Sequence, residues 1–497
     1  MASNKRFSRR GFLSSPAAVT GGLFAGLAEN VSAVSRRNSM FVEGYGPLKP
    51  AGDELSLPPG FSYTTVSYED EMMADGFPVP SAMDGMGTFA LPNGNILLIR
   101  NHENAETGDR FRPRPATSTS TTAGMLTRIL DTHYGPRRAA YDAYAGGGTT
   151  SIEVDPRTRR RVREHWSLVG TLRNCAGGEM PWGSWISCEE TLIQTTATVQ
   201  AQDHGYCFEV PVTTTPGNPA PAVPLKAMGL FAHEAVAADP VTGIIYETED
   251  QGDVSGFYRF IPTVKPTKPG DLAANGGRLE MLKVDLANNY LTALDQKVGV
   301  ALPVSWVPVP NPDPRPVSVT VIGNTASVVF QQGYNAGGAI FRRLEGCWYH
   351  EGKIYFTSTN GGQSGLGQIW IHDPIASTIT LLFETPDQHV LDFPDNICMS
   401  PRGGMVVCED GTAGQRLLGV TPRGEIFEFA KNIFNSLETA GACFSPDGQT
   451  LFLNLYGRST IRTATPWGSP VAHPIGSEVG EKALTLAIWG PWGSGLL

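Results

Sequence analysis

The sequence has few charged residues and no apolar run long enough to cross a membrane. Only 17% of its 497 residues are charged, and 38 lysines and arginines face 48 aspartates and glutamates, for a formal net charge of −10. An acidic surface repels nucleic-acid phosphates, so we expect no nucleic-acid partner. The apolar stretch at 16–28 is too short and too rich in glycine to span a bilayer. A hydrophobic content of 41% is that of a globular protein.

Several sequence signatures are also missing. No glycine-rich phosphate loop follows an expected strand, no apolar heptads occur, and no serine stands in a nucleophile motif. These absences argue against nucleotide-binding, coiled-coil and serine-hydrolase classes. The seven cysteines are an odd number, so at least one thiol has no partner within the molecule. In an oxidising compartment that thiol has to be buried or bound to a metal.

The N-terminus carries a recognisable export pattern. Residues 8–13 read SRRGFL and precede the short apolar stretch, which resembles a twin-arginine signal with Arg9 and Arg10 as its pair. We therefore expect a signal peptide at 1–33 and one mature domain at 34–497; the alternative is a disordered basic tail. The implied partner is the twin-arginine export machinery, which carries folded proteins, and the implied location is periplasmic or secreted.

Glycine and proline are abundant, with 57 and 38 copies, and they favour turns between short strands. A turn, a short apolar or aromatic strand and an acidic end recur along the chain. Such units are typical of β-hairpins, and irregularly spaced copies predict an all-β fold, a β-propeller with insertions at 211–225 and 302–316. A tandem of β-sandwich domains is the competing fold. The repeated units lie at 87–104, 235–253, 346–362, 395–411 and 441–457.

Acidic residues stand at equivalent strand ends of these units. In a propeller, such ends meet at the central channel, so acids from distant parts of the chain should converge there. Like charges at close range raise their pKa values or require cations between them. The sequence therefore predicts a metal site formed from Glu103, Glu189, Glu190, Glu249, Asp250, Glu409 and Asp410.

The order of motifs carries a family resemblance. NCAGGEMPWGSWISCEE (174–190) is followed by GLFAHEAVAADPVTGIIYETEDQGDVSGFYRF (229–260) and FRRLEGCWYHEGKIYFTST (341–359). PDNICMSPRGGMVVCEDG (394–411) and ETAGACFSPDGQTLFLN (438–454) complete the series. From about residue 80 to 495 the chain resembles the PhoX-type alkaline phosphatase family. The resemblance implies a six-bladed β-propeller with loop and short helical insertions, which hydrolyses phosphate monoesters with two iron and several calcium ions.

The resemblance also assigns metal ligands. Cys175 matches the family's iron-binding cysteine, and a soft thiolate is a poor calcium ligand, which indicates a transition metal beside the hard cations. We read His233 as a packing or supporting residue. Glu190, Glu234 and Glu345 match carboxylate ligands, whereas Glu249, Glu409 and Glu438 are expected calcium ligands, with Asp250 or Asp410 as replacements for their neighbours.

Phosphate needs a planar cationic donor in so acidic a site. Arg343 matches the family's substrate-binding arginine, and Arg416 is our candidate for a second one. Thr150, in the GGGTT stretch, either belongs to a tight turn or donates a hydrogen bond to phosphate. Because no serine nucleophile is evident, the attacking oxygen is expected to be metal-bound.

We expect a monomer acting on small phosphorylated organic molecules. Two alternatives stay open at this stage. One is a phosphodiesterase or lactonase-like hydrolase that uses calcium alone, and the other is a non-enzymatic propeller stiffened by calcium.

Overall fold

The computed structural model describes residues 41–104, 139–143, 145–194, 202–412, 414–457, 482–495 and 497. The expected signal peptide at 1–33 lies outside these residues, so export and cleavage stay predictions. In the part of the chain that the structure describes, no helix is both long and apolar enough to cross a membrane.

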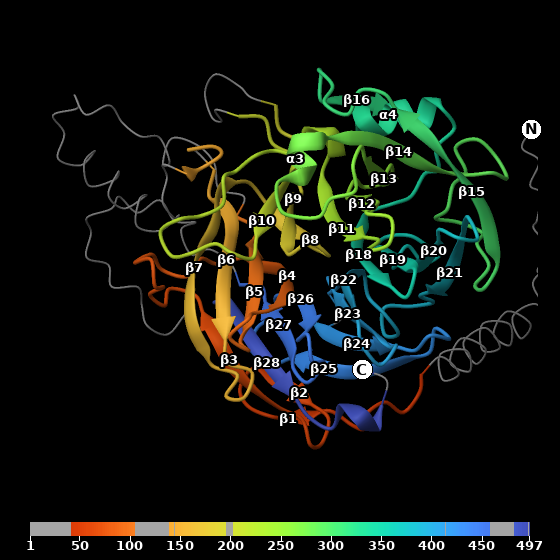
Figure 1. Cartoon of the computed structure of the whole chain (residues 1–497). Coiled ribbons are helices and arrows are strands. Elements are labelled where there is room, and N and C mark those ends of the chain that lie inside the picture. The colour runs from red at the N-terminus through yellow and green to blue at the C-terminus, as the bar shows by residue number, and fades with distance from the viewer. Residues whose placement is uncertain are drawn as a thin grey trace, which may run out of the picture.

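Antiparallel sheets are arranged around a common centre (Figure 1). All five repeated units form hairpins, and the cysteine-containing stretch at 174–190 forms another. The expected all-β, propeller-like fold is therefore confirmed. The sheets surround one centre and do not form stacked pairs in tandem, as the competing sandwich fold would require.

The first two sheets contain four and three strands. Each begins with the strand nearest the centre, and the strands follow outwards in sequence order (Figure 1). The four-stranded sheet consists of β4 (Met83–Ala90), β5 (Ile96–His102), β6 (Gly147–Val154) and β7 (Arg161–Thr171), and the three-stranded sheet consists of β8 (Asn174–Met180), β9 (Ser184–Glu189) and β10 (Cys207–Pro211).

A nine-stranded sheet follows, in which two series of strands meet at their outer edges through the pairing of β15 with β21. One series is β11 (His233–Ala238), β12 (Ile245–Glu249), β13 (Phe257–Pro262), β14 (Gly277–Val284) and β15 (Ala301–Val309), and the other is β18 (Leu344–His350), β19 (Lys353–Ser358), β20 (Gln368–Asp373) and β21 (Thr378–Glu384).

The expectation of an insertion over 302–316 was wrong for its first half. Those residues lie in β15, whose Pro308 faces Glu280 of β14. Prolines are tolerated at the outer edge of a sheet, where not every backbone N–H is needed for pairing. The short elements between the two series are β16 (Ser318–Val321), β17 (Asn324–Ser327) and α4 (Val328–Asn335), whereas α3 (Asp271–Asn275) lies between β13 and β14.

The last two sheets include N-terminal strands. Pairing of the first long strand with the last strand of the chain closes the arrangement non-locally. One sheet consists of β22 (Pro394–Met399), β23 (Met405–Glu409), β24 (Arg416–Val420) and β25 (Ile426–Asn432), extended by β2 (Leu55–Leu57) and β1 (Lys49–Pro50), and the other of β26 (Thr439–Phe444), β27 (Leu451–Leu455), β28 (Leu484–Trp489) and β3 (Ser62–Tyr68).

The central strands contact one another in a closed cycle, β4–β8–β11–β18–β22–β26 and back to β4. Each of these strands has a register irregularity just after its start, where it pairs with the next strand outwards. A β-bulge bends a strand and turns a side chain in a new direction. The same local device therefore recurs around the centre, at the end of each strand where the acids lie.

Small residues allow the central strands to approach closely. A Cβ on Gly346 would lie 2.5 Å from the carbonyl oxygen of Asp395, and one on Gly441 would lie 2.3 Å from that of Asp84. Outside this centre, apolar side chains of adjacent sheets pack face to face. One such cluster joins Met86 and Leu98 to Phe452 of the neighbouring sheet, which holds the ring together.

Candidate metal centre

The second residue of five central strands bears a metal-ligating side chain. All five are buried, although carboxylate and thiol side chains are not favoured in a protein interior unless they have partners. They come from five different strands, so the ring of strands itself brings them together. These residues are Asp84 on β4, Cys175 on β8, Glu234 on β11, Glu345 on β18 and Asp395 on β22.

A second layer comes from the residues that directly follow the second strand of each hairpin. In five hairpins the backbone N–H of this residue donates to the carbonyl of the residue two positions before the first-layer residue; for example, Glu190 N–H donates to Arg173 and Asp410 N–H to Phe393. In the sixth hairpin Tyr456 N–H donates to the carbonyl of Glu438. This repeated hydrogen bond sets the two layers next to each other. The second layer consists of Glu103, Glu190, Asp250, Thr359, Asp410 and Tyr456.

At this centre, three groups of side chains have ligand atoms close enough to share a metal ion, all within 4.8 Å of one another in each group. The groups share Glu234 and Asp395, so they form a continuous series. Carboxylates with two oxygens can bridge neighbouring cations. The groups are Cys175 with Glu190 and Glu234, then Glu234 with Glu345 and Asp395, then Asp395 with Asp410 and Glu438.

The electrostatics of this cluster fit cations. Burial and then the charges of neighbouring carboxylates raise the pKa values of Glu190, Glu234 and Glu345 well above their ordinary range. Burial, followed by Asp84 and Glu234, likewise raises the pKa of the Cys175 thiol. The buried Oε2 of Glu234 has no hydrogen-bond partner. A thiolate beside several carboxylates is a suitable donor set for a transition metal next to harder ions.

Acidic pairs divide between the cluster and the interior of the sheets. Glu249 accepts hydrogen bonds from Gly256 N–H, Tyr258 Oη and Ser327 Oγ, at 3.0, 2.6 and 2.6 Å. Glu409 accepts from Arg416 Nη2 at 2.6 Å and from Asp392 N–H at 2.8 Å.

The expectation that Glu249 and Glu409 lie with the other ligands is therefore not met. Successive side chains along a strand point to opposite faces, so the following residue of each pair, Asp250 or Asp410, joins the second layer instead. In the pair at 189–190, Glu189 accepts from Leu172 N–H and contacts His204, while Glu190 lies in the cluster.

Two arginines lie beside the acids. Arg343 Nη2 is 2.6 Å from Glu345 Oε1 and 3.6 Å from Asp410 Oδ2, and Arg173 Nη2 is 3.0 Å from Glu190 Oε2. Burial alone would lower the pKa of Arg343, but Glu345 and Asp250 outweigh it and raise that pKa. The side chains of Arg343 and Arg173 are 31% and 41% exposed, whereas that of Glu345 is 4% exposed. The two guanidinium groups therefore lie on the solvent side of the cluster.

Arg173 and Arg343 hold equivalent places in their hairpins. Each precedes its first-layer residue, Cys175 or Glu345, by two positions, and each has a positive φ, of 49° and 36°. Non-glycine residues in this conformation are uncommon and concentrate at functional sites. Sequence reasoning missed Arg173, although its spacing from Cys175 matches that of Arg343 from Glu345.

The other expected substrate contacts lie elsewhere. Arg416 is paired with Glu409 and Glu428 and donates to the His389 carbonyl, so its donors are used within its own sheet. Thr150 is fully buried in β6, where its Oγ1 lies 3.1 Å from Arg100 Nη2. The structure therefore does not bring Arg416 or Thr150 to the acidic cluster.

Sequence reasoning also missed Asp84, Asp395 and Tyr456. Cys175 Sγ lies 3.4 Å from Asp84 Oδ2, and Tyr456 Oη donates to Glu103. Asp84 and Asp395 stand at the start of a repeated hairpin, as Cys175 and Glu234 do. The signal that could have found them is this shared position at the beginning of a central strand.

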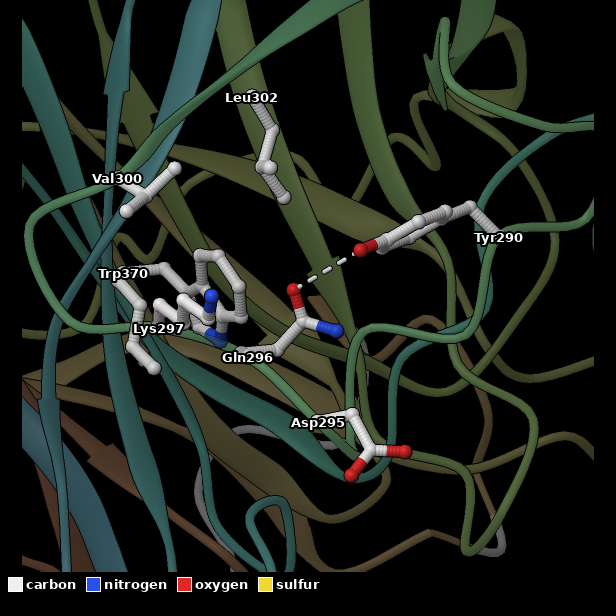
Figure 2. Close-up of a pocket in the computed structure, with 8 residues that line it drawn as sticks. Tyr290, Asp295, Gln296, Lys297, Val300, Leu302 and Trp370 are labelled. Atoms are coloured by element: carbon white, nitrogen blue, oxygen red, sulfur yellow. Dashed lines mark hydrogen bonds between the residues drawn. The ribbon is translucent and has the colours of Figure 1, made fainter.

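A separate pocket lies beside β15, β20 and β21, and Figure 2 shows Tyr290, Gln296 and Trp370 in its wall. Tyr290 Oη donates to Gln296 Oε1 at 3.2 Å. The pocket lining contains Asp295 and Lys297 but no member of the acidic cluster. Its chemistry does not match a charged phosphate ester, so we place the functional site at the cluster.

We expect the metal-free chain to lose stability as pH rises. Asp395 is buried, and its pKa is raised from 3.8 to about 6, first by burial. The contribution of Asp395 to the free energy of unfolding is therefore fully present below about pH 4. It is lost as pH rises through 6, which lowers the free energy of unfolding by about 3 kcal/mol for this residue. Thermal unfolding of chelator-treated protein should show a lower Tm at pH 8 than at pH 5. A metal-free Tm that is equal or higher at pH 8 would contradict this electrostatic interpretation.

Comparisons with known proteins agree with this geometry. The family model described as alkaline phosphatase PhoX matches residues 43–457. No curated protein matches the chain in sequence.

Among solved structures, PhoX of Pseudomonas fluorescens in complex with vanadate, a transition state analogue, is similar with a TM-score of 0.63 and 17% identity, over 91% of this chain and 98% of that one. A gluconolactonase from Xanthomonas campestris has a TM-score of only 0.35 and 9% identity, over 89% and 99% of the two chains. The first likeness supports the propeller-like fold.

Proposed function

The chain belongs to the alkaline phosphatase PhoX family, and on that premise we propose that it is a metal-dependent phosphomonoester hydrolase that releases inorganic phosphate. The observation that carries this proposal is the juxtaposition of three carboxylate-rich metal groups with two partly exposed arginines. Acids alone would repel a phosphate ester, and arginines alone would bind it without activating it. Together they suit phosphoryl transfer, which depends on positioning and charge stabilisation.

We propose that the cluster holds two iron ions and several calcium ions. The group with Cys175 suits iron because thiolate is a soft ligand, and the all-carboxylate groups at the other end of the series suit calcium. When bound, these cations neutralise charge on the phosphate oxygens and acidify an attacking water. Glu234 belongs to two of the groups and its Oε2 has no hydrogen-bond partner, so this carboxylate would help to hold the cations of both groups.

Arginine side chains orient the substrate in this proposal. Arg173 contacts Glu190, and Asp250 lies 3.4 Å from Arg343 Nε. The charge of Asp250 helps to raise the pKa of Glu190, so these two acids are neighbours. The two guanidinium groups thus flank one acidic pair. Planar guanidinium donors bind two phosphate oxygens at once, so this arrangement can hold a phosphoryl group above the cluster in one orientation.

Acidic and phenolic partners hold the arginines in place. Arg173 Nε donates to Glu103 Oε1 at 3.2 Å, and Tyr456 donates to the other oxygen of Glu103. Burial and the charge of Glu103 raise the pKa of Tyr456 well above its ordinary value, so the hydroxyl keeps its proton. Because both oxygens of Glu103 are engaged, Arg173 has little freedom to turn away from the cluster.

We propose that the fold is a six-bladed β-propeller. The nine-stranded sheet then represents two blades, β11–β14 and β18–β21, that are joined at their outer edges by β15. Support comes from the cycle of central strands and from the bulge that recurs in each of them. Export through the twin-arginine pathway, action in the periplasm or outside the cell, and a monomeric state are also proposals.

Replacement of Cys175 tests the function directly. We expect Cys175→Ala to lose iron while keeping calcium, and to lose most hydrolysis of p-nitrophenyl phosphate, because the variant removes the soft ligand. The measurement is elemental analysis of the protein from an exporting host, together with monoesterase, diesterase and lactonase assays. Full iron and full activity in Cys175→Ala would overturn the proposal, and diesterase or lactonase activity alone would favour the calcium-only hydrolase.

A further inference from the structure

A second group of metal-ligating side chains lies away from the channel cluster, among β10, β11 and β12. Cys207 Sγ is 3.3 Å from His233 Nδ1, and Glu247 Oε2 is also 3.3 Å from His233 Nδ1. Cys207, His233 and Glu247 are all fully buried. A tetrahedral zinc site with ordinary bond lengths of about 2.0–2.3 Å has ligand atoms roughly 3.3–3.8 Å apart. Both distances from His233 Nδ1 already have this spacing, and the ligand atoms of all three residues lie within 4.8 Å of one another.

The histidine presents a lone pair to this group. His233 Nε2 lies 3.1 Å from the carbonyl oxygen of Gly229, which can only accept, so Nε2 carries the proton and Nδ1 does not. A histidine that donates its other ring N–H to a carbonyl is the usual arrangement of a metal-bound imidazole.

Glu247 has no other partner. Both of its carboxylate oxygens are buried without a hydrogen bond in the structure. Glu249, two residues further on the same face of β12, has three protein donors, so the fold does satisfy buried carboxylates when it can. A buried carboxylate without donors costs several kcal/mol as an anion, which a bound cation would offset.

We propose that Cys207, His233 and Glu247 bind a divalent transition ion of the zinc type, in a structural site distinct from the channel cluster. Cys188 Sγ, 3.7 Å from Cys207 Sγ on the paired strand β9, is the neighbouring fourth donor. Thiolate, imidazole and carboxylate are a common zinc ligand set, whereas calcium prefers oxygen alone. The ion would tie β9 and β10 to β11 and β12.

The site does not depend on the proposed phosphatase reaction. His233 and Glu234 are adjacent on β11, but His233 stacks on Phe231 at 3.6 Å between ring centres, while Glu234 joins the channel groups. The surrounding side chains include Phe231, Val236 and Tyr258, which are apolar or aromatic and buried. Water would not readily replace a lost ligand there.

Metal content distinguishes this site from the channel. In full-length protein from an exporting host, we expect Glu247→Gln to contain one zinc-type ion per chain fewer than wild type, with channel metals unchanged. Glu179→Gln is the control, because Glu179 is a partly buried carboxylate on the neighbouring strand β8 that accepts a hydrogen bond from Thr88 N–H. Equal metal content in wild type and Glu247→Gln would overturn the proposal, and Glu247 would then be a protonated acid.

Cobalt(II) provides a second measurement. In a Cys175→Ser background, which lacks the channel thiolate, metal-free protein loaded with cobalt should still show a thiolate-to-cobalt absorption band. Adding both Cys188→Ser and Cys207→Ser should abolish that band while the circular dichroism spectrum is unchanged. A missing band in Cys175→Ser, or an unreduced wild-type mass showing a Cys188–Cys207 disulfide, would also reject the site, whatever the phosphatase assays show.

Discussion

Glu234→Gln should reduce kcat/KM for an aryl phosphate by at least about a thousandfold. Glu234 is the carboxylate shared by two of the three metal groups, and its Oε2 has no protein partner. A neutral amide keeps the size of the side chain but cannot bridge two cations. We therefore expect metal content to fall at both groups, as measured by elemental analysis alongside steady-state kinetics.

Folding of this variant can be checked independently. Burial and the charges of Asp395 and Glu190 raise the pKa of Glu234, so removal of its charge should leave the metal-free chain at least as stable as metal-free wild type at pH 8. Glu179→Gln, which alters a partly buried acid outside the cluster, should keep the metal content and the activity of the wild type. Wild-type metal content and kinetics in Glu234→Gln would reject the shared-ligand role.

Arg343→Ala should lower kcat/KM by about a hundred- to a thousandfold while the metal content stays at the wild-type level. Arg343 is partly exposed and contacts Glu345 and Asp410, so its guanidinium lies where a phosphate would approach the cluster. Loss of this charge removes stabilisation of the transition state and also weakens binding, so kcat should fall and KM should rise. Arg343→Lys should recover only part of the loss, because an ammonium group cannot bind two oxygens in a planar fork.

The neighbouring arginine supplies the control. Arg342 is paired with Asp253, at 3.2 Å, and has no contact with the acidic groups among the described residues. Arg342→Ala should therefore keep wild-type kinetics. If Arg342→Ala and Arg343→Ala lost activity equally, the effect would come from the loop before β18 and the phosphate-binding role would fail.

Much of the fold follows from local chemistry that is visible in the sequence. Turn residues between short apolar strands predict hairpins because each hairpin is specified by its own turn and alternation. The units at 235–253 and 395–411 are such hairpins in the structure, β11–β12 and β22–β23. Cys175, Glu234 and Glu345 were assigned by the family resemblance that the ordered motifs carry, and not by this local chemistry.

The sequence by itself determined the hairpins, the family and the gathering of acids at strand ends. Only the tertiary structure decided which acid of each pair faces the centre, Asp250 and Asp410 but not Glu249 and Glu409. That choice depends on the phase of the strand pleat relative to the bulge, and a shift of one residue reverses it. Two further features depend on which side chains become neighbours: Arg173 pairs with Glu190, and Arg416 pairs with Glu409 inside its own sheet. Packing across the ring sets these neighbours, and no local sequence pattern does.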